Sequence, residues 1–222
     1  MTLHEIGIRV LRAFAVGLYG FFGGTKVYGT ENIPPSGAVL LCPNHSSLSD
    51  PVGVFVASHR LFHYMAAAEL FDIPGLGWLI TFLQAFPVRR GENDIAAITH
   101  CNKLLKQGEG VVVFPEGKMS EDGLLGEFYG GAVLLALRNR CPIVPVAMFG
   151  FNKMLPYNGK FLHFARKRVC FGKPLLFDFK GSGLSVKEQI SVASAQLRQA
   201  LIDMGVPVKE SQAIHSERGG TH

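Results

Sequence analysis

Three continuous apolar runs of strand length, separated by segments of helical periodicity, constrain the fold of this chain most strongly. The runs are 37–42, 110–114 and 142–149, and the first follows a Pro-Pro-Ser-Gly turn. Short continuous apolar runs of this kind are typical of buried strands. Helices are expected at 50–59, 95–105, 128–139 and 185–204. Strands that alternate with helices predict an α/β fold, here a single domain with a central mixed sheet flanked by helices.

Two segments are expected at the edge of this sheet. Residues 166–171 alternate basic and apolar side chains, as an edge strand does. The last apolar run contains Pro145, which has no backbone N–H to donate and therefore indicates an edge strand or a bulge. A further strand is predicted at 61–66.

The composition limits the classes of protein to which the chain can belong. Its 222 residues are 48% hydrophobic and 18% charged, and 17 of them are phenylalanine. Such a chain is not disordered and is long enough for a hydrophobic core. We also expect it to present apolar surface to a membrane or an acyl chain. The net charge of +5 favours anionic partners but is too small to indicate nucleic acid.

The two ends of the chain differ from its centre. Residues 13–25 are uncharged, but this run is too short for a membrane span of about 20 residues. With Arg9 and Arg12, the N-terminal pattern indicates a basic amphipathic helix in the membrane interface, although a core helix fits it too. The apolar positions at helical spacing are Ile6, Val10, Leu11, Phe14 and Leu18. We therefore expect an N-terminal membrane-associating helix (1–24), a main domain (25–204) and a flexible polar tail (205–222).

The four cysteines are far apart in the sequence. They are Cys42, Cys101, Cys141 and Cys170. Their spacing fits neither a zinc site nor a disulfide framework. We expect reduced, mostly buried thiols and no bound metal.

The segment 44–50, Asn-His-Ser-Ser-Leu-Ser-Asp, connects the first buried strand to the start of a helix. Loops in this position of α/β proteins carry functional groups. If the loop curls, the Asp50 carboxylate meets the His45 imidazole, fixes its tautomer and leaves the other ring nitrogen to take a proton. Asp50 is also expected to cap the helix, with Pro51 at its first position. A helix cap beside a surface-loop histidine would give the same pattern.

Two other segments carry charge at the ends of apolar runs. Glu116 and Lys118 follow the strand at 110–114, and Gly117 gives the backbone freedom between them. This is no phosphate-binding P-loop, because no glycine stands five residues before Gly117. Arg89 and Arg90 could fork onto a phosphate, although two solvated arginines give the same pattern.

In combination, four segments resemble the lysophospholipid/glycerolipid acyltransferase superfamily, of the bacterial 1-acylglycerol-3-phosphate acyltransferase type. The family's marks are Asn-His-x4-Asp, an apolar block ending in Arg, Phe-Pro-Glu-Gly-x-x-Ser and an apolar Val-Pro-Val-type block. Here they occupy 44–50, 86–90, 114–120 and 143–149. Many members have Thr-Arg where this chain has Lys118 and Met119, so the family's arginine cannot be carried over. Lys118 is the candidate to supply that charge, as a point charge and not as a fork.

The resemblance implies transfer of a fatty acyl group to the hydroxyl of a lysophospholipid, above all 1-acylglycerol-3-phosphate, in phospholipid biosynthesis. The co-substrate would be acyl-CoA or acyl carrier protein (acyl-ACP), with no other cofactor. His45 would be the general base and Asp50 its orienting partner. The implied substrate-binding residues are Asn44, Arg89, Arg90, Glu116, Gly117, Lys118 and Ser120.

The implied partners are a membrane lipid acceptor and the acyl donor, at the cytoplasmic face of a membrane, with peripheral or re-entrant attachment. Residues 73–86 are the candidates for apolar contact with the acyl chain. The alternatives are a lipid-binding protein of the same fold without catalysis, and a thioesterase that uses the same dyad with water. The chain has no Gly-x-Ser-x-Gly elbow of a serine hydrolase.

Overall fold

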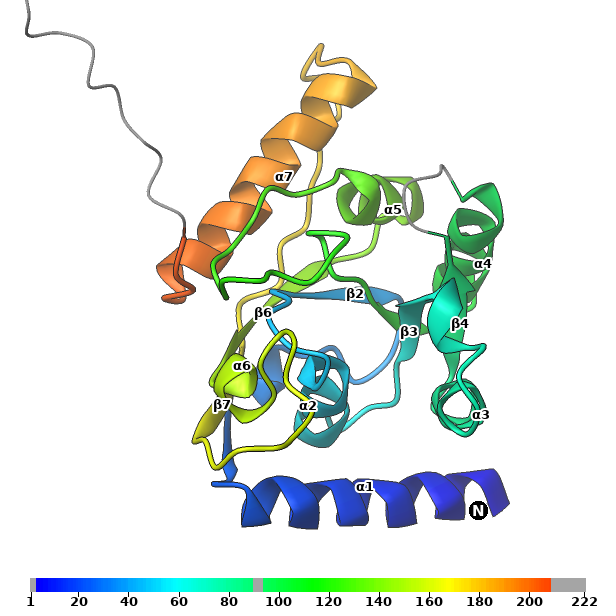
Figure 1. The fold of residues 1–222 in the computed structure, drawn as a ribbon. Coiled ribbons are helices and arrows are strands. Elements are labelled where there is room, and N and C mark those ends of the chain that lie inside the picture. Colours follow the sequence, from blue (N-terminus) through cyan, green and yellow to red (C-terminus); the bar gives the residue numbers. More distant parts are fainter. Residues whose placement is uncertain (1–2, 90–93, 209–222) are drawn as a thin grey trace, which may run out of the picture.

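The computed structural model describes residues 3–89 and 94–208. They form a seven-stranded sheet in the order β1-β7-β6-β2-β5-β3-β4, with helices on both faces (Figure 1). The five strands from β6 to β4 are parallel, whereas β6 and β7 pair antiparallel and β1 lies parallel to β7. The predicted α/β fold with a mixed sheet is confirmed.

The strands are β1 (Thr25–Tyr28), β2 (Val39–Pro43), β3 (His63–Ala67), β4 (Ala85–Val88), β5 (Gly110–Val112), β6 (Ile143–Phe149) and β7 (Lys167–Phe171). The α-helices are α1 (Leu3–Phe21), α2 (Asp50–Ala57), α3 (Leu76–Phe82), α4 (Ile95–Lys106), α5 (Gly131–Asn139), α6 (Phe151–Met154) and α7 (Val186–Asp203). Two short 3-10 helices are η1 (Thr30–Asn32) and η2 (Ala68–Leu70).

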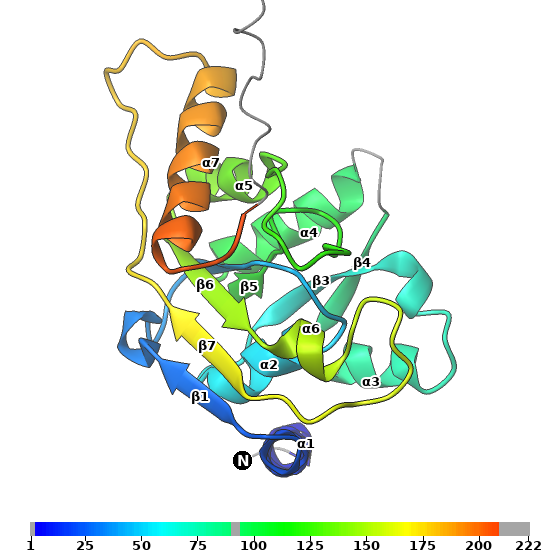
Figure 2. The same ribbon diagram turned by 60° about the vertical axis from the view of Figure 1, so that its left-hand side comes forward.

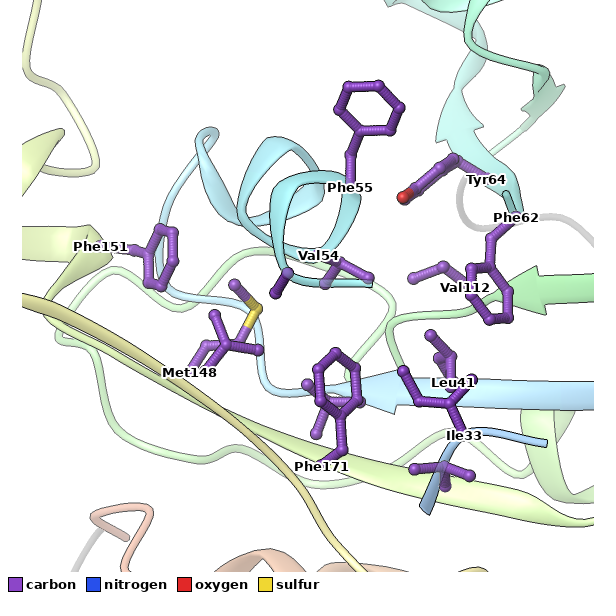
Figure 3. Packing of buried hydrophobic residues seen from close by; sticks show 14 of the residues in the cluster. Ile33, Leu41, Val54, Phe55, Phe62, Tyr64, Val112, Met148, Phe151 and Phe171 are labelled. Carbon is purple, nitrogen blue, oxygen red and sulfur yellow. The ribbon is translucent and has the colours of Figure 1, made fainter. Parts of the chain in front are cut away.

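The sheet separates two hydrophobic cores, because consecutive residues of a strand point to opposite faces. In β2, Val39 and Leu41 join the core formed with α1, α2 and α6, of which Figure 3 shows the part around α2. Leu40 and Cys42 join the core formed with α4, α5 and α7. Cys101 and Cys141 are also buried in this second core. Continuous apolar runs therefore do correspond to strands that are covered on both sides.

The prediction that Pro145 marks an edge strand is wrong, whereas the predicted bulge is supported: Val146 pairs with Phe171 but Ile143 pairs with Leu175, so the partner chain has one extra residue beside Pro145. Pro145 lies in β6, which has a partner strand on each side. The N–H of Ile143 donates to Leu175 O, and the carbonyl of Pro145 accepts from Gly172. Residues two apart in a strand direct their backbone groups to the same side. The N–H that Pro145 lacks would therefore face the segment that follows β7 in the sequence. The proline therefore costs the sheet no hydrogen bond to β7.

The prediction that residues 166–171 form an edge strand is also wrong, because β1 pairs with β7 on its outer side (Figure 2). The first basic residue of β7, Lys167, is buried, and its ammonium group donates to the carbonyls of Phe22 and Ala165. Alternation of basic and apolar residues therefore does not identify an edge strand when one basic side chain is buried and hydrogen-bonded inside the fold. The strand β1 has no apolar run to reveal it.

Element boundaries differ from the predicted ones where local hydrogen bonds decide them. The helix expected from residue 128 begins at Gly131, because the N–H of Tyr129 is bonded to Pro115 O. Helix α7 begins at Val186, one residue later than predicted, because Ser185 is its cap and forms a capping box with Glu188. The first part of the segment predicted as a tail packs on the body, with Val206 buried. The rest of that segment, 209–222, lies outside the described residues.

Helix α1 is apolar on two sides. Its inner side buries Ile8, Ala15 and Tyr19 against the body, whereas Val10 and Phe14 of the predicted apolar stripe are 65% and 66% exposed. The inner side packs as a core helix does, and the membrane-interface reading of the outer side stays a prediction. Among the described residues, no helix is long and apolar enough to cross a membrane.

Candidate active site

The candidate site lies where the loops after two neighbouring strands diverge. The chain leaves β2 toward α2 on one face of the sheet, and it leaves the adjacent β5 toward α5 on the other face. In α/β sheets, a crevice forms at such a point outside the carboxyl ends of the strands. The loop 44–50 after β2 and the loop 113–130 after β5 meet there.

His45 and Asp50 form the contact that the sequence predicts. His45 Nδ1 lies 3.0 Å from Asp50 Oδ2. The same oxygen accepts the N–H groups of Ser46 at 2.7 Å and Ser47 at 2.8 Å. Asp50 is not the helix cap, because Ser49 holds the cap position and Asp50 is the first helical residue. Its carboxylate turns back to the loop, where three donors converge on it.

The surroundings of the pair set the tautomer of His45. Burial raises the pKa of Asp50, and the hydrogen bonds from His45, Ser47 and Ser46 oppose this effect. When Asp50 is ionised it accepts Nδ1–H, which leaves Nε2 as the free proton acceptor. In the described part of the chain, no protein group hydrogen-bonds Nε2. The imidazole stacks on the Phe114 ring, with 4.0 Å between the centroids.

Glu116 joins the two loops. Its Oε1 accepts the backbone N–H of His45 at 2.8 Å, and its Oε2 accepts the N–H of Gly126 at 2.9 Å. The N–H of Ser120 donates to the carbonyl of His45 at 2.7 Å, which adds a second connection. Burial raises the pKa of Glu116, and these backbone hydrogen bonds work against the increase. The carboxylate therefore braces the backbone of the loop that carries His45, a role different from the predicted contact with substrate, which stays a prediction.

Asn44 is held in place by strand β6. Its Oδ1 accepts the N–H of Met148 at 2.8 Å, and its Nδ2 donates to the carbonyl of the same residue at 3.2 Å. The side chain is buried and continues the pairing of β2 with β6 by two bonds. These bonds hold the entrance of the loop, and the contact of Asn44 with substrate stays a prediction.

The predicted phosphate-binding residues are less closely gathered. Arg89 is exposed at the end of β4, three strand spacings of about 4.8 Å from β2. Its neighbour Arg90 lies outside the described residues. Lys118 is exposed in the loop after β5. Gly117 before it has a φ of +65°, and a Cβ there would lie 2.9 Å from the Tyr129 ring, so glycine is required.

Neither a metal-binding cluster among the described residues nor the cavity between α4 and α5 accounts for the site. Among the described residues, no cluster of three or more His, Cys, Asp or Glu could hold a metal ion. A surface cavity of about 550 Å³ lies between α4 and α5, away from the dyad. It is lined by Thr99, Asn102, Lys103, Lys106, Gln107, Arg138 and Asn139.

Comparison with known proteins assigns the family. The family model described as Acyltransferase matches residues 24–149, which is more than half of the chain. The chain belongs to the acyltransferase family. The match includes both loops that meet at His45.

Several curated relatives of this acyltransferase-family protein bear the same activity in their names. It is 35% identical over 187 residues to the 1-acyl-sn-glycerol-3-phosphate acyltransferase of Bacillus subtilis, covering 82% of this chain and 88% of the relative. It is 29% identical over 165 residues to a chloroplastic 1-acyl-sn-glycerol-3-phosphate acyltransferase of Brassica napus, covering 72% of this chain. The chain spans 47% of the Brassica protein and 46% of a similar Arabidopsis thaliana protein, about half of their length.

The fold of this acyltransferase-family protein is also that of a solved structure. The crystal structure of the 1-acyl-sn-glycerophosphate (LPA) acyltransferase PlsC from Thermotoga maritima superposes with a TM-score of 0.72. The alignment covers 91% of this chain and 82% of the other, at 22% identity. At this identity the likeness establishes the shared fold.

The acyltransferase family motifs located His45, Asp50 and Glu116, but not all of the residues that hold them. Phe114 stacks on the imidazole, and Tyr19 donates from α1 to the carbonyl of Ser49. The only sequence signal for Tyr19 is its helical spacing from Ile8 and Ala15, the other buried residues of α1.

Proposed function

We propose that the protein transfers a fatty acyl group from acyl-CoA or acyl-ACP to the hydroxyl of 1-acylglycerol-3-phosphate and so produces phosphatidic acid. The observation that carries this proposal is the His45–Asp50 pair at the carboxyl edge of the sheet, with Nε2 free to accept a proton. The name shared by the Bacillus and Brassica relatives supports this acceptor.

In this mechanism, His45 acts as the general base. Nε2 takes the proton of the acceptor hydroxyl while its oxygen attacks the thioester carbonyl and the new C–O bond forms. The C–S bond then breaks, and the departing thiolate receives the proton from the imidazolium. Asp50 stabilises the imidazolium because its buried carboxylate is within 3.0 Å of Nδ1. General-base catalysis of this type contributes roughly 10²–10⁴-fold.

The acceptor is bound through its phosphate and its chain. Arg89 at the end of β4, Arg90 as the next residue in the sequence, and Lys118 after β5 supply the positive charge for the phosphate. The segment 73–86 includes α3, on which Trp78 is exposed, and offers apolar contact to the acyl chain. We further infer that α1 lies in the membrane interface at the cytoplasmic face with its exposed apolar side toward lipid.

An acyl-transfer assay with a matched variant tests the function. Wild-type protein is incubated with acyl-CoA or acyl-ACP and 1-acylglycerol-3-phosphate, and phosphatidic acid is measured. We expect His45→Ala to lower kcat by roughly 10²–10⁴-fold, because the general base is lost. The control is His59→Ala, which removes an exposed histidine just after α2.

Three outcomes would contradict the proposal. Equal rates for wild-type protein and His45→Ala would exclude the general-base role. Binding of the lysolipid without product from any donor would indicate a lipid-binding protein. Release of free fatty acid at the same rate with and without acceptor would indicate a thioesterase.

A further inference from the structure

A hydrogen bond connects the N-terminal helix to the loop that carries the dyad. The hydroxyl of Tyr19 in α1 donates to the carbonyl of Ser49 at 2.8 Å, and Tyr19 is only 4% exposed. Burial raises the pKa of Tyr19, so its phenol stays protonated and remains a donor. The two residues are far apart in the sequence, and this contact is independent of the family motifs.

The acceptor of this bond lies next to the catalytic carboxylate. Ser49 O belongs to the peptide group that leads directly into Asp50, at the first turn of α2. The same oxygen also accepts the N–H of Gly53, as expected for a helix start. Loss of the Tyr19 hydroxyl would therefore leave this carbonyl one partner, and the helix would still form.

Tyr19 is itself held firmly in place. Its ring packs near Phe151, with 6.1 Å between the ring centroids. The ammonium group of Lys167 lies 5.3 Å from the centroid of the Tyr19 ring. The same ammonium group donates at 2.8 Å to the carbonyl of Phe22, immediately after α1. The end of α1 and the position of Tyr19 are thus fixed from β7.

We propose that Tyr19 is a positioning residue, through which α1 holds the Ser49–Asp50 peptide and so orients the carboxylate toward His45. This inference rests on the proposed acyl transfer. It makes α1 part of the active-site scaffold, in addition to its exposed apolar side. The charged groups that face His45 are Asp50 and Glu116, and only the first is reached through Tyr19.

The test removes one oxygen atom. In Tyr19→Phe, we expect kcat for acyl transfer to fall about three- to tenfold with KM unchanged, as the loss of one positioning hydrogen bond predicts. The matched control is Tyr64→Phe, because Tyr64 is also a buried tyrosine but its hydroxyl has no partner among the described residues. We expect this control to retain the wild-type kcat.

A double-mutant cycle separates positioning from general weakening of the fold. If Tyr19 acts through Asp50, Tyr19→Phe has no further effect on kcat in the Asp50→Asn background. Equal fold-reductions in both backgrounds, or wild-type kcat in Tyr19→Phe, would overturn the inference. Absence of acyl transfer by the wild-type protein would instead refute the proposed function, so the two failures are distinguishable.

Discussion

Asp50 and Glu116 are two buried carboxylates at one edge of the sheet, and their partners give them different tasks. Asp50 directs one oxygen at the imidazole and at two N–H groups of its own loop. Glu116 bonds one N–H from each of two loops. The first carboxylate orients a proton acceptor, and the second keeps the backbone that carries it in place.

Replacement of Glu116 by glutamine separates bracing from charge. Glutamine offers one acceptor where two N–H groups point, so Glu116→Gln is expected to lower the free energy of unfolding by about 1–3 kcal/mol. Because burial raises the pKa of Glu116 above its ordinary value of 4.5, the ionised wild-type side chain costs folding free energy. The difference in free energy of unfolding between the wild type and Glu116→Gln is therefore largest below pH 4.5. It shrinks as the pH rises through the raised pKa of Glu116.

Urea unfolding of both proteins between pH 4 and pH 7 measures this difference (about three pH units are enough to titrate one carboxyl group). A difference in free energy of unfolding that grows with pH would contradict this expectation, because it would mean that Glu116 stabilises the fold more when it is ionised.

At the scale of one element, α1 has two separate uses for its apolar residues. The inner side fixes the helix and presents Tyr19 to the catalytic loop. The outer side leaves Val10 and Phe14 about two thirds exposed. An exposed apolar side on an otherwise well-packed helix is a feature of membrane-interface helices.

Charges on the outer side of α1 are expected to weaken membrane binding alone. The variant Val10→Asp/Phe14→Asp should bind vesicles of anionic phospholipid roughly tenfold less tightly or worse, because it loses apolar contact and adds negative charge. Its free energy of unfolding should remain near that of the wild type, since both side chains are exposed. Vesicle sedimentation and chemical unfolding measure the two quantities.

The control for this experiment is Leu176→Asp/Val186→Asp, which makes the same charge change at two exposed apolar residues, of which Val186 begins α7. Equal loss of vesicle binding by both double variants would show a general charge effect and would remove α1 from the proposed interface.

At the scale of the whole molecule, one sheet supports two cores and places the site between them. Five parallel strands give the loops after β2 and β5 a common edge, while their helices cover opposite faces. Because the sheet is covered on both faces, neighbouring residues of β2 are both inaccessible to solvent. Leu40 and Leu41 are each 0% exposed.

Truncation on either face of β2 should therefore be equally severe. We expect Leu40→Ala and Leu41→Ala each to lower the free energy of unfolding by about 2–5 kcal/mol, as cavity formation in a packed core predicts. Chemical unfolding followed by circular dichroism measures both. A cost below about 1 kcal/mol for one of them would mean that its face of the strand is not packed.

The sequence by itself determined those features that depend on neighbours along the chain. Apolar runs identified buried strands, and helical spacing identified the last helix, expected at 185–204 and found at Val186–Asp203. The pairing of His45 with Asp50 could be predicted because both residues lie in one short loop between a strand and a helix. The family motifs added the chemistry.

The tertiary structure alone decided what depends on strand order and on contacts between distant segments. It placed Pro145 in an interior strand, used Glu116 to join two loops, and brought Tyr19 from α1 to the peptide group before Asp50. No local pattern encodes such contacts, because hydrophobic periodicity specifies which face of an element is buried but not which element covers it.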